Sequence, residues 1–236
     1  MSPPGSAMAT APVVTVDGPS GAGKGTISRV LAGRLGWHLL DSGALYRLVA
    51  YAGLHKGLAA DDRTGHAGLA RDLDSHFGAT AEGTELILLG GIDVTASIRT
   101  EQSGMGASRV AAWPEVRAAL LTRQRSFASP PGLVADGRDM GTVVFPGAAL
   151  KIFLVASAEE RALRRYNQLK GKDSAVTLAA LSREIAARDR QDATRPVAPL
   201  VPAEDAVVID STRLSVAEVV ERVWRLGVER GLWQEG

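Results

Sequence analysis

The sequence predicts an α/β protein built on a doubly wound parallel sheet of five strands. Short β-branched runs alternate with segments whose apolar residues recur at helical spacing, which is typical of strands joined by crossover helices. Three of the predicted strands end in polar sequences, at residues 17–18, 41–43 and 136–139. Because ligands of such sheets bind at the carboxyl ends of the strands, these three junctions predict a common binding site.

The first part of the chain follows this alternation closely. A strand is predicted at 13–16, a helix at about 27–35 that ends at Gly36, a second strand at 37–40 and a second helix at about 45–52. A glycine-rich segment separates the first strand from the first helix. We therefore expect this segment to be a loop at the carboxyl edge of the sheet.

The middle of the chain, residues 61–127, does not continue the alternation. Two apolar runs, 86–89 and 92–94, flank Gly90-Gly91 and predict a hairpin. Helical patterns follow at about 102–112 and 115–127, with Pro114 suited to a first helical turn. We interpret this region as a small α+β insert in a core formed by residues 13–60 and 128–236.

Alternation resumes after the insert. The remaining strands are predicted at 133–135, 151–155 and 207–209, and the remaining helices begin near residues 157, 178 and 215. Two sequences of the form Ser-x-x-Glu, at Ser157 to Glu160 and at Ser215 to Glu218, predict capping boxes at two of these helices. A loop is predicted at 171–173.

Composition narrows the functional classes. The chain has 236 residues, 45% hydrophobic and 22% charged, which suits a globular protein with its own core. With 27 Lys and Arg against 26 Asp and Glu, the net charge is +1, so we expect neither nucleic acid nor a membrane as partner.

The absence of Cys excludes disulfides and thiol nucleophiles and fits a cytoplasmic protein. We expect residues 1–12 to be a disordered tail and the chain to be a monomer.

The glycine-rich loop predicts phosphate binding. It consists of Gly18, Pro19, Ser20, Gly21, Ala22, Gly23, Lys24, Gly25 and Thr26. The glycines let backbone N–H groups turn inward around a polyphosphate, and the helix N-terminus that follows favours negative charge. Lys24 would reach the β- and γ-phosphates of ATP, and Thr26 would hold Mg²⁺ directly or through water. Gly25 separates Lys24 from Thr26, whereas the strict motif has Ser or Thr directly after Lys.

The loop form Gly-x-x-Gly-x-Gly-Lys-Gly-Thr is similar to that of nucleoside monophosphate kinases. With the segments 40–47, 135–146 and 185–195, the chain resembles bacterial cytidylate kinases from about Val13 to Glu221. The resemblance implies a P-loop kinase that transfers the γ-phosphoryl group of ATP to CMP or dCMP with Mg²⁺, in pyrimidine nucleotide metabolism. It also implies that the insert binds the nucleoside monophosphate and that residues of about 157–196 form a short helical lid.

At matched positions the resemblance implies an acceptor site. Its CMP-binding residues would be Ser42, Arg47, Ser108, Arg117, Asp139, Arg188, Asp192 and Arg195. Ser42, Ser108 and Arg117 would contact the base, and Arg47 would contact the α-phosphate. Asp139 would hold the sugar hydroxyls. Arg188, Asp192 and Arg195 would bind the phosphate and the pentose of the acceptor.

Arginines supply the remaining predicted site residues. Arg138 resembles a second phosphate-binding arginine of the family, and a guanidinium can donate to two phosphate oxygens at once. Arg138, Lys24 and Arg188 form the expected catalytic set. Arg161, Arg164 and Arg165 share a helix face at the start of the lid. We expect Arg161 and Arg165 to bind ATP, whose charge would offset their mutual repulsion; an ordinary solvated face is the alternative.

Some features admit two interpretations. Arg188, Asp192 and Arg195 are four and three residues apart, so a helix would place them on one face, as a site or as a surface ion pair. Asp17, Asp41 and Asp136 would cap turns, or Asp136 would join Asp139 in holding Mg²⁺ through waters.

The segment 101–106 departs from the family sequence. Its glycines, Gly104 and Gly106, would each weaken a helix by about 1 kcal/mol relative to Ala.

Two other functional classes stay open on the residues alone. One is a kinase with another acceptor, such as UMP or a small alcohol. The other is a nucleotide-dependent switch or a nucleic-acid motor, which the near-zero charge disfavours.

Overall fold

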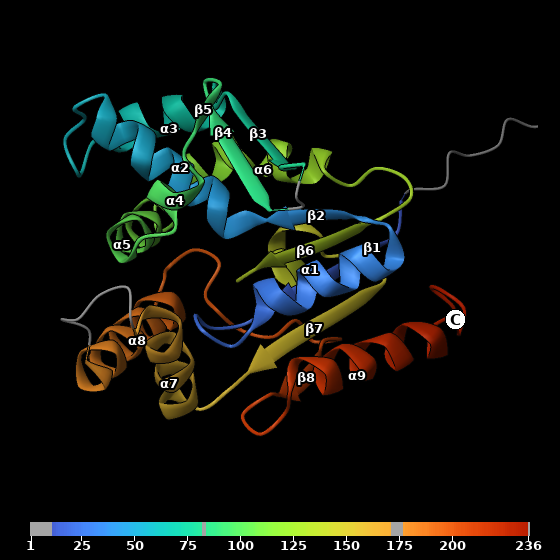
Figure 1. Cartoon of the computed structure of the whole chain (residues 1–236). Coiled ribbons are helices and arrows are strands. Elements are labelled where there is room, and N and C mark those ends of the chain that lie inside the picture. The colour runs from blue at the N-terminus through green and yellow to red at the C-terminus, as the bar shows by residue number, and fades with distance from the viewer. Residues whose placement is uncertain (1–10, 82–83, 171–176, 236) are drawn as a thin grey trace, which may run out of the picture.

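The computed structural model describes residues 11–81, 84–170 and 177–235. Its central sheet has five parallel strands in the order β2-β6-β1-β7-β8 (Figure 1). The strands are β1 (Val13–Asp17), β2 (His38–Asp41), β6 (Leu133–Gly137), β7 (Leu150–Val155) and β8 (Val207–Asp210). The predicted five-stranded parallel sheet is confirmed. Most of the predicted tail and the predicted loop at 171–173 lie outside the described residues.

Helices cover both faces of the sheet, as the doubly wound class requires. The helices packed on its faces include α1 (Lys24–Leu35), α2 (Ser42–His55) and α9 (Val216–Glu229), whereas α7 (Ala158–Leu169) and α8 (Leu178–Ala193) lie beside its carboxyl end. Val14 and Val16 of β1 pack with residues of α1 and α9 in one apolar cluster. Val13 belongs to a second cluster, which contains α2 and the insert. Because successive side chains of a strand point to opposite faces, β1 is buried on both sides.

The insert combines a small antiparallel sheet with helices. Its elements are α3 (Arg63–Arg71), β3 (Ser75–Ala79), β4 (Glu85–Leu89), β5 (Ile92–Asp93), α4 (Thr95–Ile98), α5 (Glu101–Val110) and α6 (Pro114–Ser126). The predicted β4–β5 hairpin is confirmed, and Gly90 and Gly91 both have positive φ in its turn. Strand β3, which pairs with β4, and helices α3 and α4 were not predicted. The sequence of β3 contains one large apolar residue, Phe77, so it lacks a strand pattern.

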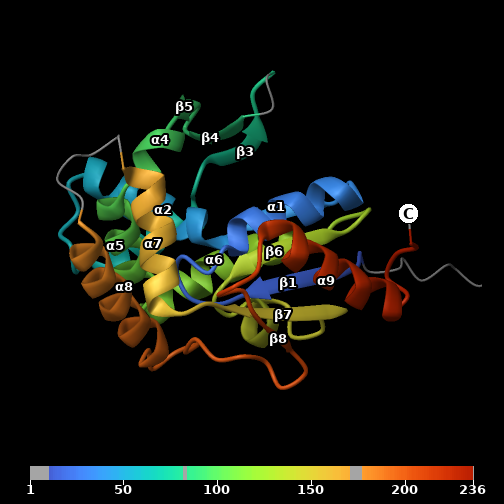
Figure 2. The same cartoon turned by 60° about the horizontal axis from the view of Figure 1, so that its bottom comes forward.

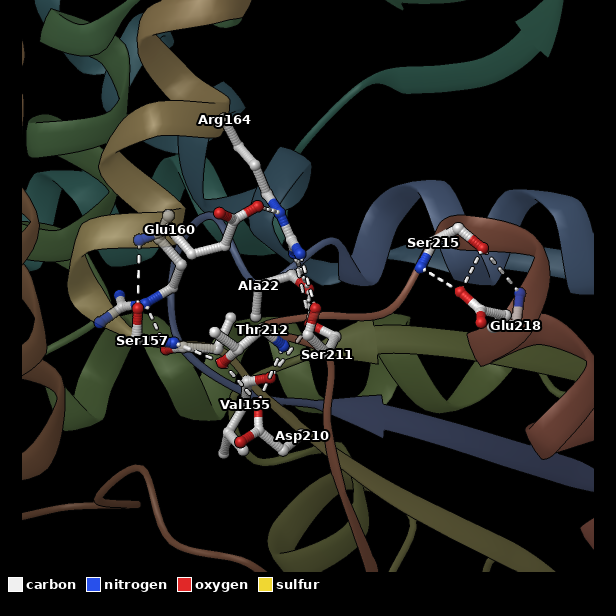
Figure 3. Close-up of polar contacts among 12 residues, drawn as sticks. Ala22, Val155, Ser157, Glu160, Arg164, Asp210, Ser211, Thr212, Ser215 and Glu218 are labelled. Atoms are coloured by element: carbon white, nitrogen blue, oxygen red, sulfur yellow. Dashed lines mark hydrogen bonds and ion pairs between the residues drawn. The ribbon is translucent and has the colours of Figure 1, made fainter.

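The two predicted capping boxes differ in outcome. Ser215 and Glu218 exchange both hydrogen bonds at the start of α9, as predicted (Figure 3). Ser157 Oγ accepts from the Glu160 backbone N–H at 3.2 Å. The prediction of a return hydrogen bond, from the Ser157 backbone N–H to the Glu160 carboxylate, is wrong. The Glu160 carboxylate accepts instead from Arg164 Nε at 2.8 Å, because Arg164 lies one turn away on the same face.

Helices α7 and α8 pack against each other beside the carboxyl end of the sheet, and α8 also contacts α5 of the insert (Figures 1 and 2). The space above the strand ends is therefore enclosed by three parts of the chain. In the described ranges, none of the helices has the length and apolar character needed to cross a membrane.

Candidate active site

A cavity of about 390 Å³ lies at the carboxyl ends of β1, β2 and β6. The three polar junctions therefore converge, as predicted. The predicted site residues that line it are Ser20, Gly21, Gly23, Lys24, Gly25, Thr26, Ser42, Arg47, Ser108, Arg117, Arg138, Asp139, Arg165, Arg188, Asp192 and Arg195. Gly18, Pro19, Ala22 and Arg161 do not line it. The first three belong to the body of the loop, and Arg161 points to protein partners described below.

At three positions, Gly18, Gly21 and Gly23, the phosphate-binding loop has a positive φ that only glycine adopts easily. Gly18 has φ 147°, and a Cβ there would clash with the carbonyl oxygen of Leu154. Gly23 is the N-cap of α1 with φ 97°. Lys24, the first residue of α1, donates to the Pro19 carbonyl at 3.0 Å and so arches back over the loop. The N-terminus of α1 opens into the cavity beside it.

The loop is held from behind by α7 and the segment after β8. Ser211 Oγ donates to the Ala22 carbonyl at 3.2 Å and lies 3.0 Å from the Val155 carbonyl (Figure 3). Arg164 donates to the Ser211 carbonyl at 2.6 Å. The Ala22 carbonyl of the loop is thereby bonded within the protein.

Arg161 and Arg165, the two arginines predicted to bind ATP, lie in different surroundings. The Arg161 guanidinium is bidentate to Asp189 of α8, at 2.9 and 2.5 Å, and also donates to the carbonyls of Ser20 and Ala156, both at 3.0 Å. With 4% exposure, it ties α7 to α8 and to the phosphate loop. Arg165 lines the cavity and lies 3.2 Å from Glu101.

Several cations in the cavity are poorly neutralised. Burial, followed by the neighbouring Arg138, lowers the pKa of Lys24. Burial, followed by Arg188 and Arg99, lowers the pKa of Arg47 to about 10. Burial also lowers the pKa of Arg188, with Arg138 adding to the effect. A group of buried cations that repel one another is the electrostatic signature of an anion site.

Geometry supports the same conclusion. Lys24 Nζ lies 4.0 Å from Asp136 Oδ1, and Arg188 Nη1 lies 4.0 Å from Glu101 Oε1, both longer than a hydrogen bond. Among the described residues, the buried Nε atoms of Arg188 and Arg195 have no hydrogen-bond partner. Unpaired buried donors of this kind are rare unless a ligand or water completes them.

Other arginines of the cavity are held by carboxylates. Arg138 Nε donates to Asp192 Oδ2 at 2.9 Å, and Arg117 is ion-paired with Asp139. Burial would lower the pKa of Arg138, but Asp192 outweighs it and the pKa rises. Asp192 and Arg195 lie on or just after α8; both are buried and line the cavity, so they do not form an exposed surface pair.

Asp17 supports the turn that carries Arg138 and Asp139. Its carboxylate accepts from the backbone N–H groups of Met140 and Gly141, both at 2.8 Å. These residues begin a π-helical turn, η1 (Met140–Val144), which was not predicted. Burial raises the pKa of Asp17 to about 6. Asp17 therefore caps the turn after β6 rather than the turn that follows it in sequence, because β1 and β6 are neighbours in the sheet.

Asp41 has two functions in the fold. As predicted, it caps the following helix, since its Oδ1 accepts from the Ala44 N–H at 3.0 Å. Its Oδ2 accepts from Arg99 at 2.8 Å, and Arg99 is also bidentate to Glu85 of β4, at 3.1 and 2.6 Å. Sequence reasoning missed Arg99 and Glu85, because an ion pair between the insert and β2 has no signal in either local sequence.

The segment 101–106 is helical despite its glycines. It forms the start of α5, with the Thr100 side chain accepting from Ser103 N–H. A Cβ on Gly104 would lie 3.0 Å from Arg47 Nη2 and 3.2 Å from Arg188 Nη1. The expected weak helix is therefore stabilised by packing, and Gly104 lets two cavity arginines approach the helix backbone.

Two residues near Ser42 at the α2 and α6 end of the cavity, Tyr46 and Gln124, were missed by sequence reasoning. Ser42 Oγ donates to Gln124 Oε1 at 2.8 Å, and both residues are buried. Tyr46 lines the cavity, with the Arg117 guanidinium 5.9 Å from its ring centroid. Gln124 follows Val116 and Leu120 at spacings of four on the buried face of α6. A polar residue at an apolar position was the signal that could have identified it.

The residues present suit a magnesium ion held with substrate phosphates. In the described part of the chain, no three His, Cys, Asp or Glu side chains are grouped so that they could hold a metal by themselves. Mg²⁺ in phosphoryl-transfer sites needs only one or two protein oxygens besides the phosphates. Thr26 and Asp136 both line the cavity, and a Cβ on Gly25 would lie 3.2 Å from Asp136 Oδ2.

Known proteins resemble this chain over most of its length. A sequence model of the family described as "Cytidylate kinase" matches residues 14–228. A cytidylate kinase of Pseudomonas fluorescens (strain SBW25) is 61% identical over 90% of this chain and 93% of its own. A cytidylate kinase of Marinomonas sp. (strain MWYL1) is 57% identical over 94% of this chain and 97% of its own. Among solved structures, a gluconokinase from Sinorhizobium meliloti 1021 is 16% identical, with a TM-score of 0.46, over 92% of this chain and 94% of that chain.

Proposed function

The chain belongs to the cytidylate kinase family, and from this premise we propose how its cavity moves the γ-phosphoryl group of ATP to CMP or dCMP. The activity is that of a nucleoside monophosphate kinase, a transferase. The observation that carries the proposal is the set of buried, poorly neutralised cations beside a phosphate-binding loop. Two phosphate groups brought into this cavity would supply the missing negative charge.

ATP binds on the loop side. Backbone N–H groups of the loop, which Pro19 lacks, and the N-terminus of α1 receive its phosphates, and Lys24 bridges the β- and γ-phosphates. Arg165 faces the same space from α7, while Arg161 acts behind the loop by joining Ser20 to Asp189. We therefore assign Arg165 to ATP and give Arg161 a positioning role.

The acceptor nucleotide binds between α2, α5, α6 and α8. Arg47, Arg138 and Arg188 take its phosphate, and Asp192 orients Arg138. Ser42, Ser108 and Arg117 contact the base, Asp139, which is paired with Arg117, holds the sugar hydroxyls, and Asp192 and Arg195 contact the pentose. In this proposal residues 61–127 form the monophosphate-binding insert, and residues of about 157–196 form the lid.

Magnesium is the proposed cofactor. Thr26 would hold it, directly or through water, with Asp136 as the nearby carboxylate. Bound Mg²⁺ would neutralise charge on the β- and γ-phosphates during transfer.

The chemistry needs orientation and charge neutralisation rather than covalent help. An oxygen of the CMP phosphate attacks the γ-phosphorus, the bond from that phosphorus to the β–γ bridging oxygen breaks, and ADP leaves with the electron pair. No general base is required, because the attacking oxygen is already ionised near neutral pH. Lys24 and the arginines stabilise the charge on the transferred group and hold the two phosphates in line.

A panel of acceptors tests the proposal. ADP formation from ATP and Mg²⁺ is measured with CMP, dCMP, UMP, AMP and GMP. Strong turnover with CMP and dCMP, and little with the others, is expected. ADP release without an acceptor, or with no acceptor preferred, would contradict it and favour a switch or another kinase. We further propose a cytoplasmic monomer, on the near-zero charge and the absence of Cys.

A further inference from the structure

The Ser42 hydroxyl has one proton and two lone pairs, and the structure assigns the proton. Ser42 Oγ donates it to Gln124 Oε1 at 2.8 Å across a buried contact. Ser42 is 3% exposed and Gln124 1% exposed, so water does not compete for this bond. With its proton occupied, the hydroxyl can offer the cavity only lone pairs.

The neighbouring groups at this end of the cavity are also fixed. Asp139 is ionically paired with Arg117, so its carboxylate contributes acceptor oxygens and Arg117 contributes donors. The cavity thus presents an acceptor at Ser42 near a donor at Arg117. Cytosine carries an amino donor at C4 and acceptors at N3 and O2, whereas uracil carries an acceptor oxygen at C4.

We infer that Gln124 determines specificity for a 4-amino pyrimidine by holding the Ser42 hydroxyl in its accepting orientation. The inference rests on the proposed function and deepens it, since it explains how one acceptor base is preferred. Gln124 lines no part of the cavity and is a positioning residue, not a base contact. Without it, the Ser42 hydroxyl rotates and can donate to the C4 oxygen of a uracil base.

The test is the ratio of kcat/KM for CMP to kcat/KM for UMP, at saturating ATP and Mg²⁺, in the full chain. Gln124→Met keeps the shape of the side chain and removes the acceptor oxygen, because a thioether accepts only weakly. We expect the ratio to fall about tenfold, the value of one neutral hydrogen bond. The change is expected in the KM for the acceptor, with the KM for ATP unaltered.

A second variant covers the possibility that Gln124→Met does not fold. Gln124→Glu keeps an oxygen that accepts from Ser42 in either protonation state, so it should retain the CMP preference to within about twofold. In a Ser42→Ala background, Gln124→Met should no longer change the ratio, since the two residues act as a unit.

A matched control separates specificity from packing. Leu120→Met alters a fully buried residue one turn earlier on α6 and should leave the CMP to UMP ratio unchanged, because Leu120 has no polar group that could orient the Ser42 hydroxyl. If Gln124→Met keeps the wild-type ratio while wild type prefers CMP, the inference is overturned and the proposed function stands. If wild type itself shows no preference for CMP, both are overturned. Equal loss of the ratio in Leu120→Met would also overturn the role of Gln124.

Discussion

The phosphate end and the base end of the cavity are built on opposite electrostatic principles. At the phosphate end, Lys24 and Arg188 lie no closer than 4.0 Å to a carboxylate in the described residues, and burial depresses their pKa values. At the base end, Arg117 is paired with Asp139 and Ser42 with Gln124. These four side chains therefore already have protein partners.

This difference teaches what each end requires from its ligand. The phosphate end stores unfavourable charge that a bound polyphosphate relieves, so its side chains contribute to turnover at the expense of stability. The paired side chains of the base end are neutralised by protein partners before the ligand arrives, so they contribute to stability and to selectivity. The two ends should therefore respond differently to the same kind of substitution.

The largest effect is expected at the phosphate end, in Lys24→Ala. Loss of the cation that we propose bridges the β- and γ-phosphates should lower kcat by roughly 10³-fold, as for other preorganised charge donors. The measurement is ADP formation with CMP, alongside thermal unfolding. Because the depressed pKa of Lys24 reflects unfavourable burial, the variant should be no less stable than wild type.

Lys151→Ala is the matched control. Lys151 is also a buried lysine, but it pairs with Asp205 outside the cavity, at 2.8 Å. It should lose stability and keep its turnover. Near-native turnover in Lys24→Ala would refute the assignment of the phosphate loop.

The next largest effect is expected at the base end, in Asp139→Asn. Both side chains of the Arg117–Asp139 pair are more than nine-tenths buried, so the change leaves an uncompensated buried charge. The free energy of unfolding should fall by about 3 kcal/mol, measured by urea denaturation. Asp205→Asn, which alters a carboxylate that is 60% exposed, should lower the free energy of unfolding by less. Equal losses of unfolding free energy in the two variants would contradict the proposed difference between the ends.

A pH profile sharpens the comparison without mutation. Burial, followed by Arg138, lowers the pKa of Lys24 to about 8 from its ordinary 10.5. The lysine must be protonated to attract phosphates, so kcat/KM for ATP should fall above about pH 8, by up to about tenfold per pH unit. The kcat should stay level over the same range, because bound phosphates raise the pKa again. A kcat/KM profile that is flat to pH 10 would contradict the poor neutralisation of Lys24.

The smallest effect is expected away from both ends, at the helix caps. Ser215→Ala removes a complete capping box at α9 and should lower the free energy of unfolding by about 1 kcal/mol, with unchanged kinetics. Ser157→Ala removes one bond at α7, the helix that supports the phosphate loop. It should cost less stability but raise the KM for ATP. Thermal melts and ATP titrations of the two variants would distinguish a purely structural cap from one that supports the site.

Much of the molecule could be predicted from the sequence. The five parallel strands, the phosphate-binding loop, the β4–β5 hairpin and the Ser215 capping box are each specified by residues close together in the chain. Local spacing and the backbone freedom of glycine determine such features before any tertiary contact forms. The convergence of the polar junctions also followed, since parallel strands share one carboxyl edge.

Only the tertiary structure decided which side chains meet inside that edge. Ser42 and Gln124 are 82 residues apart, and Asp17 caps a turn 123 residues away because β1 and β6 are neighbours in the sheet. Arg161, at the start of α7, was directed to Asp189 by the packing of α7 on α8. A hydrogen bond between distant segments depends on strand order and helix packing, which no local pattern encodes, so the sequence determined the chemistry present and the fold determined its pairing.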